Sequence, residues 1–334
     1  MKVALTGIKP TATPHLGNYM GAIRPALALA EAHRALYFIA DYHALTSVRD
    51  PAALQSHVYD VAATWLACGL DPSRTLLFRQ SDVPEHCELM WILSCLVAVG
   101  QLERGHAYKD ALAQGGAPNA GLFLYPVLMS ADILLYDADV VPVGRDQLQH
   151  LELTRDLAQR LNHLYGADLV RVPEAQISHA AVLPGTDGRK MSKSHGNTLP
   201  LFATRKQLRR AVMGIVSDST PLEAPKEPNG ATVCTLYRIF ASEADVETLE
   251  AKLRAGGFGW GHAKEALFEE LDAMLAPFRE RYAALRRDEA GLDGVLQQGA
   301  AEARRIAQRT LGRVRAAVGM RPHVLMARAT APAA

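Results

Sequence analysis

The chain has few cysteines, and their spacing suits neither a disulfide framework nor a zinc site. The four stand far apart, without a CxxC pair and without a cysteine and histidine cluster at zinc-ligand spacing. We therefore expect reduced thiols in or near the core, and no metal site built from protein ligands. The cysteines are Cys68, Cys87, Cys95 and Cys234.

The chain also lacks a long apolar run and an excess of one charge. No apolar stretch approaches the roughly 20 residues that a membrane-spanning helix needs. The N-terminal apolar run meets Gly7 and Pro10 too soon for a secretory signal, so we expect a cytoplasmic protein without membrane contact. Lysine and arginine total 36 against 35 acidic residues, which excludes a uniformly basic nucleic-acid binder. Residues 301–334 are nevertheless locally basic, with seven arginines and one acid.

The first half of the chain alternates short apolar runs with helical periods. Strands are expected at residues 3–6, 36–40, 75–80 and 140–143, and helices at 15–31, 51–68, 84–99, 125–135 and about 147–164. This alternation predicts an α/β fold with a parallel, doubly wound, Rossmann-like sheet, in which ligands bind beyond the carboxyl ends of the strands. The glycine-rich residues 110–121 are expected to form a flexible insert.

The second half has helical periodicity only. Helices are expected at residues 205–216, 232–241, 243–255, 261–287 and 290–317. We therefore predict a Rossmann-like domain over residues 1–200, an all-helical C-terminal domain over 201–320, and a flexible tail over 321–334.

A cationic loop lies at the end of the α/β part. Lys190 and Lys193 are spaced by small hydroxyl residues and are approached through Gly185 and Gly188. Glycines permit a closing motion, and lysines supply point charges for phosphoryl oxygens, so this loop is a candidate for closing over a polyphosphate. A solvated basic surface loop is the alternative.

A second phosphate-type signal lies near the N-terminus, in residues 14–18. After the first expected strand, a glycine and proline loop leads to His15 and Gly17 in the first turn of a helix. Free amides and the helix dipole favour an anion there, and His15 could donate a hydrogen bond to a phosphoryl oxygen. A histidine that only caps the helix or packs against it is the alternative.

Together the two segments resemble a known pair of motifs. Residues 14–18, Pro-His-Leu-Gly-Asn, and residues 190–194, Lys-Met-Ser-Lys-Ser, are similar to the HIGH and KMSKS motifs of class I aminoacyl-tRNA synthetases. Residues 21–22, 41–44, 80–81, 125–134, 141–144 and 146–147 are similar to the tryptophanyl-tRNA synthetase family in particular. The resemblance runs from residue 3 to about residue 319.

The resemblance implies a two-step ligation. The tryptophan carboxylate attacks the α-phosphate of ATP, supplied with Mg²⁺, and the resulting adenylate passes its acyl group to the terminal 2'-hydroxyl of tRNA(Trp). The products are charged tRNA, AMP and diphosphate. The family also implies a homodimer, for which the apolar segment 90–99 is a candidate contact, and tRNA anticodon binding by the helical part. Arg305, Arg309 and Arg313 would face phosphates there, or else form a solvated face paired with local acids.

The resemblance assigns the nucleotide site residue by residue. His15, Lys190 and Lys193 would be catalytic, stabilising phosphate charge in the transition state, with Lys109 as a further candidate cation. The residues expected to bind nucleotide are Lys9, Pro10, Thr11, Gly17, Asn18, Gly144, Arg145, Asp146, Val182, Leu183, Lys190, Met191, Ser192, Lys193 and Ser194. Asp146 is equally suited to cap the following helix.

Asp132 is the residue expected to read the amino acid. It lies inside the apolar run 129–135, where a carboxylate is unfavourable unless it accepts hydrogen bonds, and an indole N–H is only a donor. The alternative is an aspartate satisfied within the protein. The remaining amino-acid-binding residues implied by the resemblance are Leu5, His43, Tyr125, Met129, Val141, Val143 and Gln147.

The sequence departs from the family pattern at a few positions. Lys9 and Thr11 stand where glutamine and serine are usual, Leu5 stands where an aromatic residue is frequent, and Arg145 adds a cation near the ribose site. Three rival interpretations remain: a tyrosyl-tRNA synthetase, a small-molecule nucleotidyltransferase of the same superfamily, and a tRNA-binding relative that has lost activity.

Overall fold

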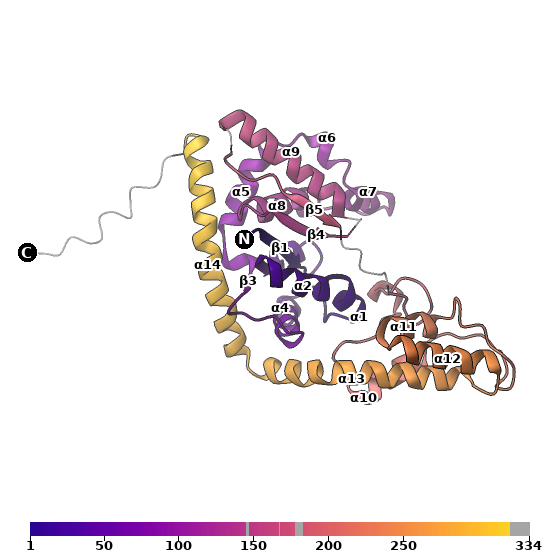
Figure 1. The fold of residues 1–334 in the computed structure, drawn as a ribbon. Helices are drawn as coiled ribbons and strands as arrows, with labels where there is room; N and C mark the ends of the chain where they lie inside the picture. Colours follow the sequence, from indigo (N-terminus) through magenta and orange to yellow (C-terminus); the bar gives the residue numbers. More distant parts are fainter. Residues whose placement is uncertain (145–146, 167, 178–182, 321–334) are drawn as a thin grey trace, which may run out of the picture.

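A parallel sheet lies at the centre of the computed structural model, which describes residues 1–144, 147–166, 168–177 and 183–320. Its strands are β1 (Val3–Ile8), β2 (Arg34–Ile39), β3 (Leu76–Arg79), β4 (Val140–Val143) and β5 (Glu174–Ile177). The strand order is β3-β2-β1-β4-β5, and all neighbours are parallel (Figure 1). The predicted Rossmann-like, doubly wound sheet is confirmed. Its order reverses between β1 and β4, where such folds bind ligands.

The central strands form because their sequences are continuously apolar. All five residues of β2 after Arg34 are buried, as expected for a strand covered on both faces. β1 continues past its predicted end at residue 6, and Gly7 fits inside the strand because it has no Cβ. A Cβ on Gly7 would lie 2.5 Å from the Phe38 ring of β2.

The fifth strand was missed by the sequence analysis. β5 lies at the edge of the sheet, paired only with β4, and its residues 174–176 are exposed. An edge strand of this kind has no apolar run to reveal it.

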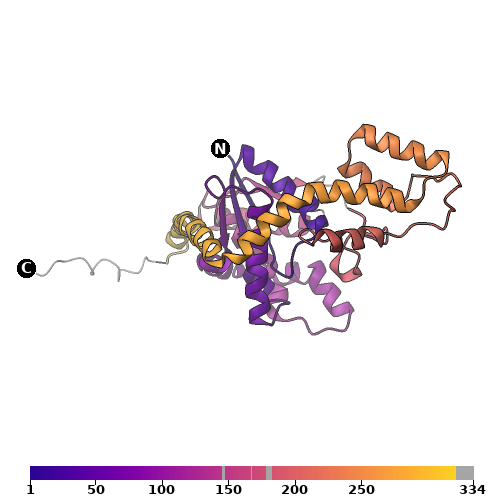
Figure 2. The same cartoon turned by 90° about the horizontal axis from the view of Figure 1, so that it is seen from below.

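The helices of the first half cover both faces of the sheet (Figures 1 and 2). They are α1 (Leu16–Asn18), η1 (Tyr19–Ile23), α2 (Arg24–Ala32), α3 (Asp41–Ala44), α4 (Pro51–Ala67), η2 (Gln80–Asp82), α5 (Glu85–Ser94), α6 (Val99–Leu102), α7 (His106–Ala113), α8 (Ala120–Leu134) and α9 (Leu148–Tyr165). The helix predicted over 15–31 is interrupted by a π-helical turn before Pro25, because proline has no N–H to continue the α pattern.

Two predictions about this half were wrong in part. The helix expected over 84–99 ends at Ser94, and a new short helix begins at Val99. The insert expected over 110–121 is helical as far as Ala113 and again from Ala120. Asn119 caps the second helix by accepting a hydrogen bond from the Leu122 amide at 2.9 Å.

The second half is helical, as predicted. It contains η4 (Lys193–His195), α10 (Arg205–Met213), α11 (Thr232–Phe240), α12 (Glu243–Ala255), α13 (Trp260–Arg287) and α14 (Glu289–Ala317). α10, α11 and α12 gather around one end of α13, away from the sheet (Figure 1). α13 returns the chain to α4, and α14 then runs along the sheet beside β3 and α5.

Close packing of α14 on β3 depends on one glycine. A Cβ on Gly299 would lie 2.0 Å from the carbonyl oxygen of Leu77, so no other residue fits without moving the helix. α14 is therefore part of the sheet-containing body of the molecule. One hydrophobic cluster also runs from Tyr37 on the sheet through α4 to Leu275 on α13. The domain boundary near residue 200 stays a prediction.

The cysteines and the surface bear on two further expectations. All four cysteines are free, but only Cys68 and Cys234 are buried, so the expectation of core or near-core thiols was wrong for Cys87 and Cys95. No helix in the described residues is long and apolar enough to cross a membrane. The cytoplasmic location stays a prediction.

Candidate active site

A cavity of about 500 Å³ opens beyond the carboxyl ends of β1, β2 and β4. It lies at the point where the strand order reverses, as predicted from the α/β alternation. All eight residues predicted to bind the amino acid line it: Leu5, His43, Tyr125, Met129, Asp132, Val141, Val143 and Gln147. Lys9 and Gly144, predicted to bind nucleotide, also line it.

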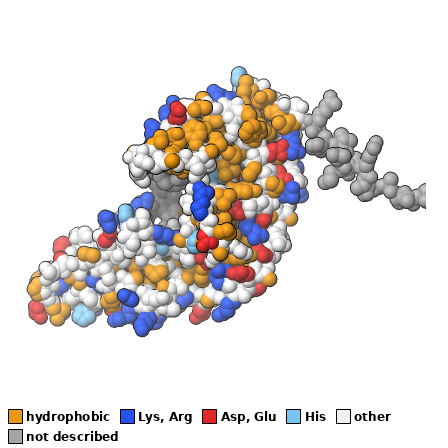
Figure 3. Space-filling view, turned by 180° about the vertical axis from the view of Figure 1, so that it is seen from behind, with side chains coloured by type: hydrophobic (Ala, Val, Ile, Leu, Met, Phe, Trp, Pro, Cys, Tyr) orange, Lys and Arg blue, Asp and Glu red, His pale blue; other side chains and the backbone are white. Residues whose placement is uncertain are grey.

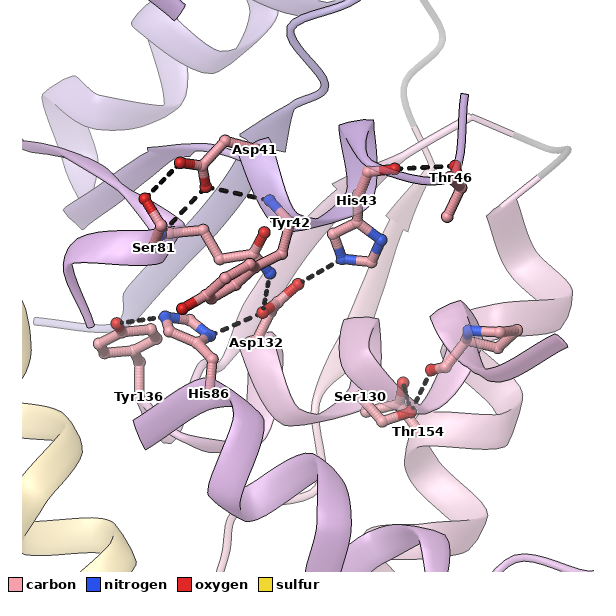
Figure 4. Close-up of polar contacts among 12 residues, drawn as sticks. Asp41, Tyr42, His43, Thr46, Ser81, His86, Ser130, Asp132, Tyr136 and Thr154 are labelled. Carbon is pink, nitrogen blue, oxygen red and sulfur yellow. Dashed lines mark hydrogen bonds and ion pairs between the residues drawn. The ribbon is translucent and has the colours of Figure 1, made fainter. Parts of the chain in front are cut away.

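Asp132 is the most buried charge of this cavity, with 1% of its surface exposed. Its Oδ2 accepts a hydrogen bond from His43 Nε2 at 2.8 Å. Its Oδ1 accepts from Gln80 Nε2 and from His86 Nδ1, both at 2.6 Å. Figure 4 shows the carboxylate held between the two histidines. These hydrogen bonds largely support the alternative of an aspartate satisfied within the protein. Whether Asp132 can also bind a ligand depends on the acceptor positions that they leave unfilled.

The hydrogen bonds keep Asp132 ionised. Burial alone would raise the pKa of this carboxyl, but the hydrogen bonds from His43 and His86 outweigh burial and lower the pKa to about 2. An ionised carboxylate offers about four acceptor positions, and the described residues fill two on Oδ1 and one on Oδ2. Among the described residues none fills the fourth position, which lies on the oxygen whose protein partner, His43, lines the cavity.

The other walls combine apolar and polar groups. Leu5, Met129, Val141 and Val143 are apolar lining residues of the cavity. The Tyr125 hydroxyl makes a 2.7 Å hydrogen bond with His150 Nε2, and its ring meets His43 edge to face at 6.2 Å. A flat aromatic ligand with one N–H donor would match this combination of a slot and a single open acceptor.

Lys9 places a cation at the rim of the cavity. Its Nζ donates a 2.8 Å hydrogen bond to the Thr46 hydroxyl, which in turn donates to the carbonyl of His43. Partial burial lowers the pKa of Lys9. The neighbouring Pro10 is buried and Thr11 is exposed, both in the loop that leads from β1 to α1.

The two phosphate-type motifs lie against each other. His15 caps α1, its Nδ1 accepting from the Gly17 amide at 3.1 Å while the Asn18 side chain accepts from the His15 amide. A Cβ on Gly17 would lie 2.9 Å from the His15 ring and 3.3 Å from Met191 Sδ. Gly17 therefore allows the lysine loop to pack directly over the start of α1.

The charges of the two motifs also interact. Burial, and then the positive charge of Lys193, lower the pKa of His15 to about 4, so this imidazole is neutral at pH 7. Lys193 and Lys190 are exposed, although partial desolvation lowers the pKa of Lys193. In the space-filling view the surface is hollowed between the group of helices α10 to α12 and the sheet-containing body. Lys and Arg side chains lie along the rim of this hollow (Figure 3).

The lysine loop is held in shape by Asn197. The Asn197 side chain accepts from the Ser192 amide at 2.8 Å and donates to Lys190 O and to Asp187 Oδ1. Met191 donates its amide to Leu183 O at 2.9 Å and is buried, while Ser194 is exposed. These contacts fix the backbone of the loop that carries Lys190 and Lys193.

Some predicted residues lie elsewhere. Arg145, Asp146 and Val182 lie outside the described residues. Lys109 is exposed on α7 and is not among the residues that line the cavity. Arg305 pairs with Glu302, and Arg313 pairs with Asp137, which favours the alternative of a face paired with local acids for these two arginines.

The sequence analysis missed the residues behind Asp132 and beside the nucleotide loop. Gln80, His86 and Tyr136 form the buried side of the Asp132 network. Asp60, in α4, accepts hydrogen bonds from Thr13 of the loop and from Tyr282 and Arg286 of α13. Gln80 stood in a segment of the resemblance but was given no role, and a polar residue near apolar segments also describes many structural residues.

Comparisons with known proteins show what the whole chain is similar to. The family profile described as tRNA synthetases class I (W and Y) matches residues 2–276. The tryptophan–tRNA ligase of Xylella fastidiosa (strain 9a5c) is 51% identical over 95% of this chain and 76% of its own length. That of Fusobacterium nucleatum is 46% identical over 96% of this chain and 98% of its own length.

Solved structures extend the comparison to the fold. The crystal structure of tryptophanyl-tRNA synthetase from Campylobacter jejuni, complexed with ADP and tryptophan, superposes with a TM-score of 0.91 at 41% identity. It covers 95% of this chain and 99% of that one. A tyrosyl-tRNA synthetase from Archaeoglobus fulgidus has a TM-score of 0.64 at 20% identity, covering 84% of this chain and 90% of that one, and shares the fold alone.

Proposed function

The chain belongs to the class I tRNA synthetases of the tryptophan and tyrosine type, and from that premise we propose that it charges tRNA(Trp) with L-tryptophan through a tryptophanyl-adenylate. It is an ATP-dependent ligase that joins tryptophan to tRNA. The adenylate route, the roles of individual residues and the assembly are our proposal.

The first step is an in-line displacement at phosphorus. A carboxylate oxygen of tryptophan forms a bond to the α-phosphorus of ATP, and the bond to the bridging oxygen breaks to release diphosphate. In the second step the terminal 2'-hydroxyl of tRNA attacks the acyl carbon, its proton is lost, and AMP leaves. Such a reaction requires positioning and charge stabilisation rather than a protein nucleophile.

The open acceptor on Asp132 is the observation that carries the proposal. An indole N–H would complete the one unfilled position on Oδ2, inside a slot formed by the apolar walls. A phenol hydroxyl could also donate there, but its oxygen would need a donor of its own. We therefore favour tryptophan over tyrosine.

At the nucleotide end we assign charge stabilisation to His15, Lys190 and Lys193. His15 is neutral at pH 7 and would donate a hydrogen bond to a phosphate oxygen, whereas the lysines would act as point charges. The described residues include no group of three or more His, Cys, Asp or Glu that could hold a metal ion. Mg²⁺ would therefore enter as part of the substrate Mg-ATP.

We propose that the helical part binds the tRNA anticodon arm. The helices that gather away from the sheet, α10 to α12 and the end of α13 that they surround, are the part available for this role, because α14 and the other end of α13 pack on the body of the molecule. Within α14, Arg305 and Arg313 already have carboxylate partners. Phosphate contacts should therefore come mainly from residues before α14.

We also propose a homodimer formed by the sheet-containing body. Trp91 on α5 is 69% exposed and Val99 on α6 is 62% exposed. Large apolar side chains this exposed favour a protein partner, and a second copy of the chain is the partner that the family pattern suggests. The segment 90–99 is thus a surface candidate for this contact, because these two side chains are not buried.

Exchange of radioactive diphosphate into ATP tests the first step. We expect exchange that depends on L-tryptophan and not on L-tyrosine, followed by charging of tRNA(Trp) when tRNA is added. Exchange supported by tyrosine alone would overturn the assignment. Exchange without any charging of tRNA would favour a small-molecule nucleotidyltransferase.

A further inference from the structure

The two carboxylate oxygens of Asp132 have different surroundings, the protein interior for Oδ1 and the cavity for Oδ2. The partners of Oδ1, Gln80 and His86, are both fully buried and do not line the cavity, whereas His43, the partner of Oδ2, does. The Oδ1 side is thus committed to the protein, and the Oδ2 side faces the cavity. A carboxylate free to rotate about its χ2 angle would not keep this distinction.

His86 has only one arrangement of protons that satisfies all its contacts with an ionised Asp132. Nδ1 must carry the proton that it donates to Oδ1 at 2.6 Å. In the neutral imidazole Nε2 is then an acceptor, and the Tyr136 hydroxyl lies 2.9 Å away as its donor (Figure 4). Burial, and then the negative charges of Asp132 and Glu85, raise the pKa of Tyr136, so the phenol keeps its proton.

The three residues lie on separate elements. His86 belongs to α5, Asp132 to α8, and Tyr136 follows the end of α8. The His86 ring is also confined by aromatic neighbours, with centroids at 5.5 Å for Tyr136 and 6.4 Å for Phe78. A side chain with both ring nitrogens bonded and its ring enclosed has one orientation, and it transmits that orientation to the carboxylate.

We infer that His86 is a positioning residue for amino-acid recognition: anchored by the Tyr136 hydroxyl, it holds the Asp132 carboxylate so that Oδ2 keeps an open acceptor for the N–H of the bound side chain. This inference rests on the proposed function and names the residues that set its specificity. His86 touches neither the cavity nor the reacting atoms, so it acts through Asp132.

The test compares L-tryptophan with an analogue in which sulfur replaces the indole N–H, β-(3-benzothienyl)-L-alanine. The measured quantity is the ratio of kcat/KM for the two compounds in diphosphate exchange, in the full-length chain. In His86→Leu we expect this ratio to fall about tenfold, mainly through KM for tryptophan, because a hydrogen bond to a charged group is lost. KM for ATP and kcat/KM for the analogue should change little.

Three further variants separate positioning from packing. The His86→Asn side chain can place an amide N–H near the position of Nδ1, and we expect it to recover most of the ratio. Tyr136→Phe removes only the anchoring hydroxyl, and we expect a loss of about threefold. Phe78→Leu loosens the packing beside the same ring without removing a hydrogen bond, and we expect the ratio to be preserved.

Several outcomes would overturn the inference. These are an equal loss for tryptophan and the analogue in His86→Leu, a loss in Phe78→Leu as large as that in His86→Leu, or no recovery in a folded His86→Asn protein. If the unmodified chain shows no tryptophan-driven exchange, the proposed function fails as well. If exchange is intact and the ratio is unchanged in His86→Leu, only this inference fails.

Discussion

The two ends of the candidate active site are built in opposite ways. At the amino-acid end the charged group is fully buried, and three protein hydrogen bonds hold it before any ligand arrives. At the nucleotide end the charged groups, Lys190 and Lys193, are exposed, and in the described part of the chain the negative charge of Asp60 acts on Lys193 without a direct ion pair. One end is preorganised and the other presents free charge.

The difference follows from what each end has to do. Selecting one amino acid requires an acceptor at a fixed position, since a small displacement would admit the wrong side chain. Stabilising a phosphate in the transition state requires positive charge that is not already neutralised by an acid. A rigid acceptor thus lies where specificity is needed, and free positive charge lies where rate is needed. Substitutions at the two ends should therefore have separable effects.

The largest effect is expected at the lysine loop. Removing the ammonium in Lys193→Ala should lower kcat for diphosphate exchange about 10²- to 10³-fold, the usual consequence of losing one group that stabilises transition-state charge. Lys193→Arg should retain more activity. Tryptophan binding, followed by fluorescence titration, should change less than about twofold. A comparable loss of tryptophan affinity would show that the two ends are not separate.

The next effect is expected at Asp60, which connects the loop between β1 and α1 to α13. Asp60 accepts from the Thr13 hydroxyl at 2.9 Å, from Tyr282 at 2.7 Å and from Arg286 Nε at 3.0 Å. Asp60→Asn should lower the free energy of unfolding by about 2 kcal/mol and raise KM for ATP more than KM for tryptophan. Urea denaturation and exchange kinetics measure the two quantities.

Asp293 provides a matched control for Asp60. It also accepts from a tyrosine hydroxyl and an arginine, but its side chain is 34% exposed, compared with 11% for Asp60. Asp293→Asn should therefore be destabilised by less than about 1 kcal/mol. Equal losses in the two variants would contradict the view that Asp60 is a special anchor of the loop.

A change of Asp132 should affect the amino-acid end alone. In Asp132→Asn the amide oxygen can still accept from Gln80 and His86, but the NH₂ group then takes the place of Oδ2. His43 can change tautomer to accept from it, whereas an indole N–H cannot. KM for tryptophan should rise about tenfold or more with KM for ATP unchanged. A parallel rise in both would mean that the pocket had collapsed.

The smallest effect is a pH dependence of stability at His15. Its pKa is about 4 in the folded chain, lowered by burial and then by Lys193, and near 6.5 when unfolded. Between these values the unfolded chain binds the proton and the folded chain does not, so stability is lost as the pH falls from about 6.5 to 4. Allowing for solvent screening, we expect about 1 kcal/mol at pH 5.

Urea denaturation at pH 7 and pH 5 measures the His15 contribution. In His15→Gln this part of the pH dependence should disappear. If the variant and the unmodified chain lost the same stability between the two pH values, His15 would not be a buried neutral imidazole.

Several elements could be predicted because their signal is local. The helices of the second half were predicted within a few residues from their periodicity alone. The residues predicted to bind the amino acid line one cavity, and their roles in binding stay predictions. β5 could not be predicted, because an exposed edge strand has no apolar period.

By itself the sequence determined the α/β order, the helical second half, the two motifs and the position of a carboxylate inside an apolar helix. Only the tertiary structure decided which donors meet that carboxylate. Gln80, His86 and His43 lie 52, 46 and 89 residues from Asp132 along the chain. Hydrogen bonds act over about 3 Å, so contacts at such separations exist only once the strands and helices that carry them have packed together.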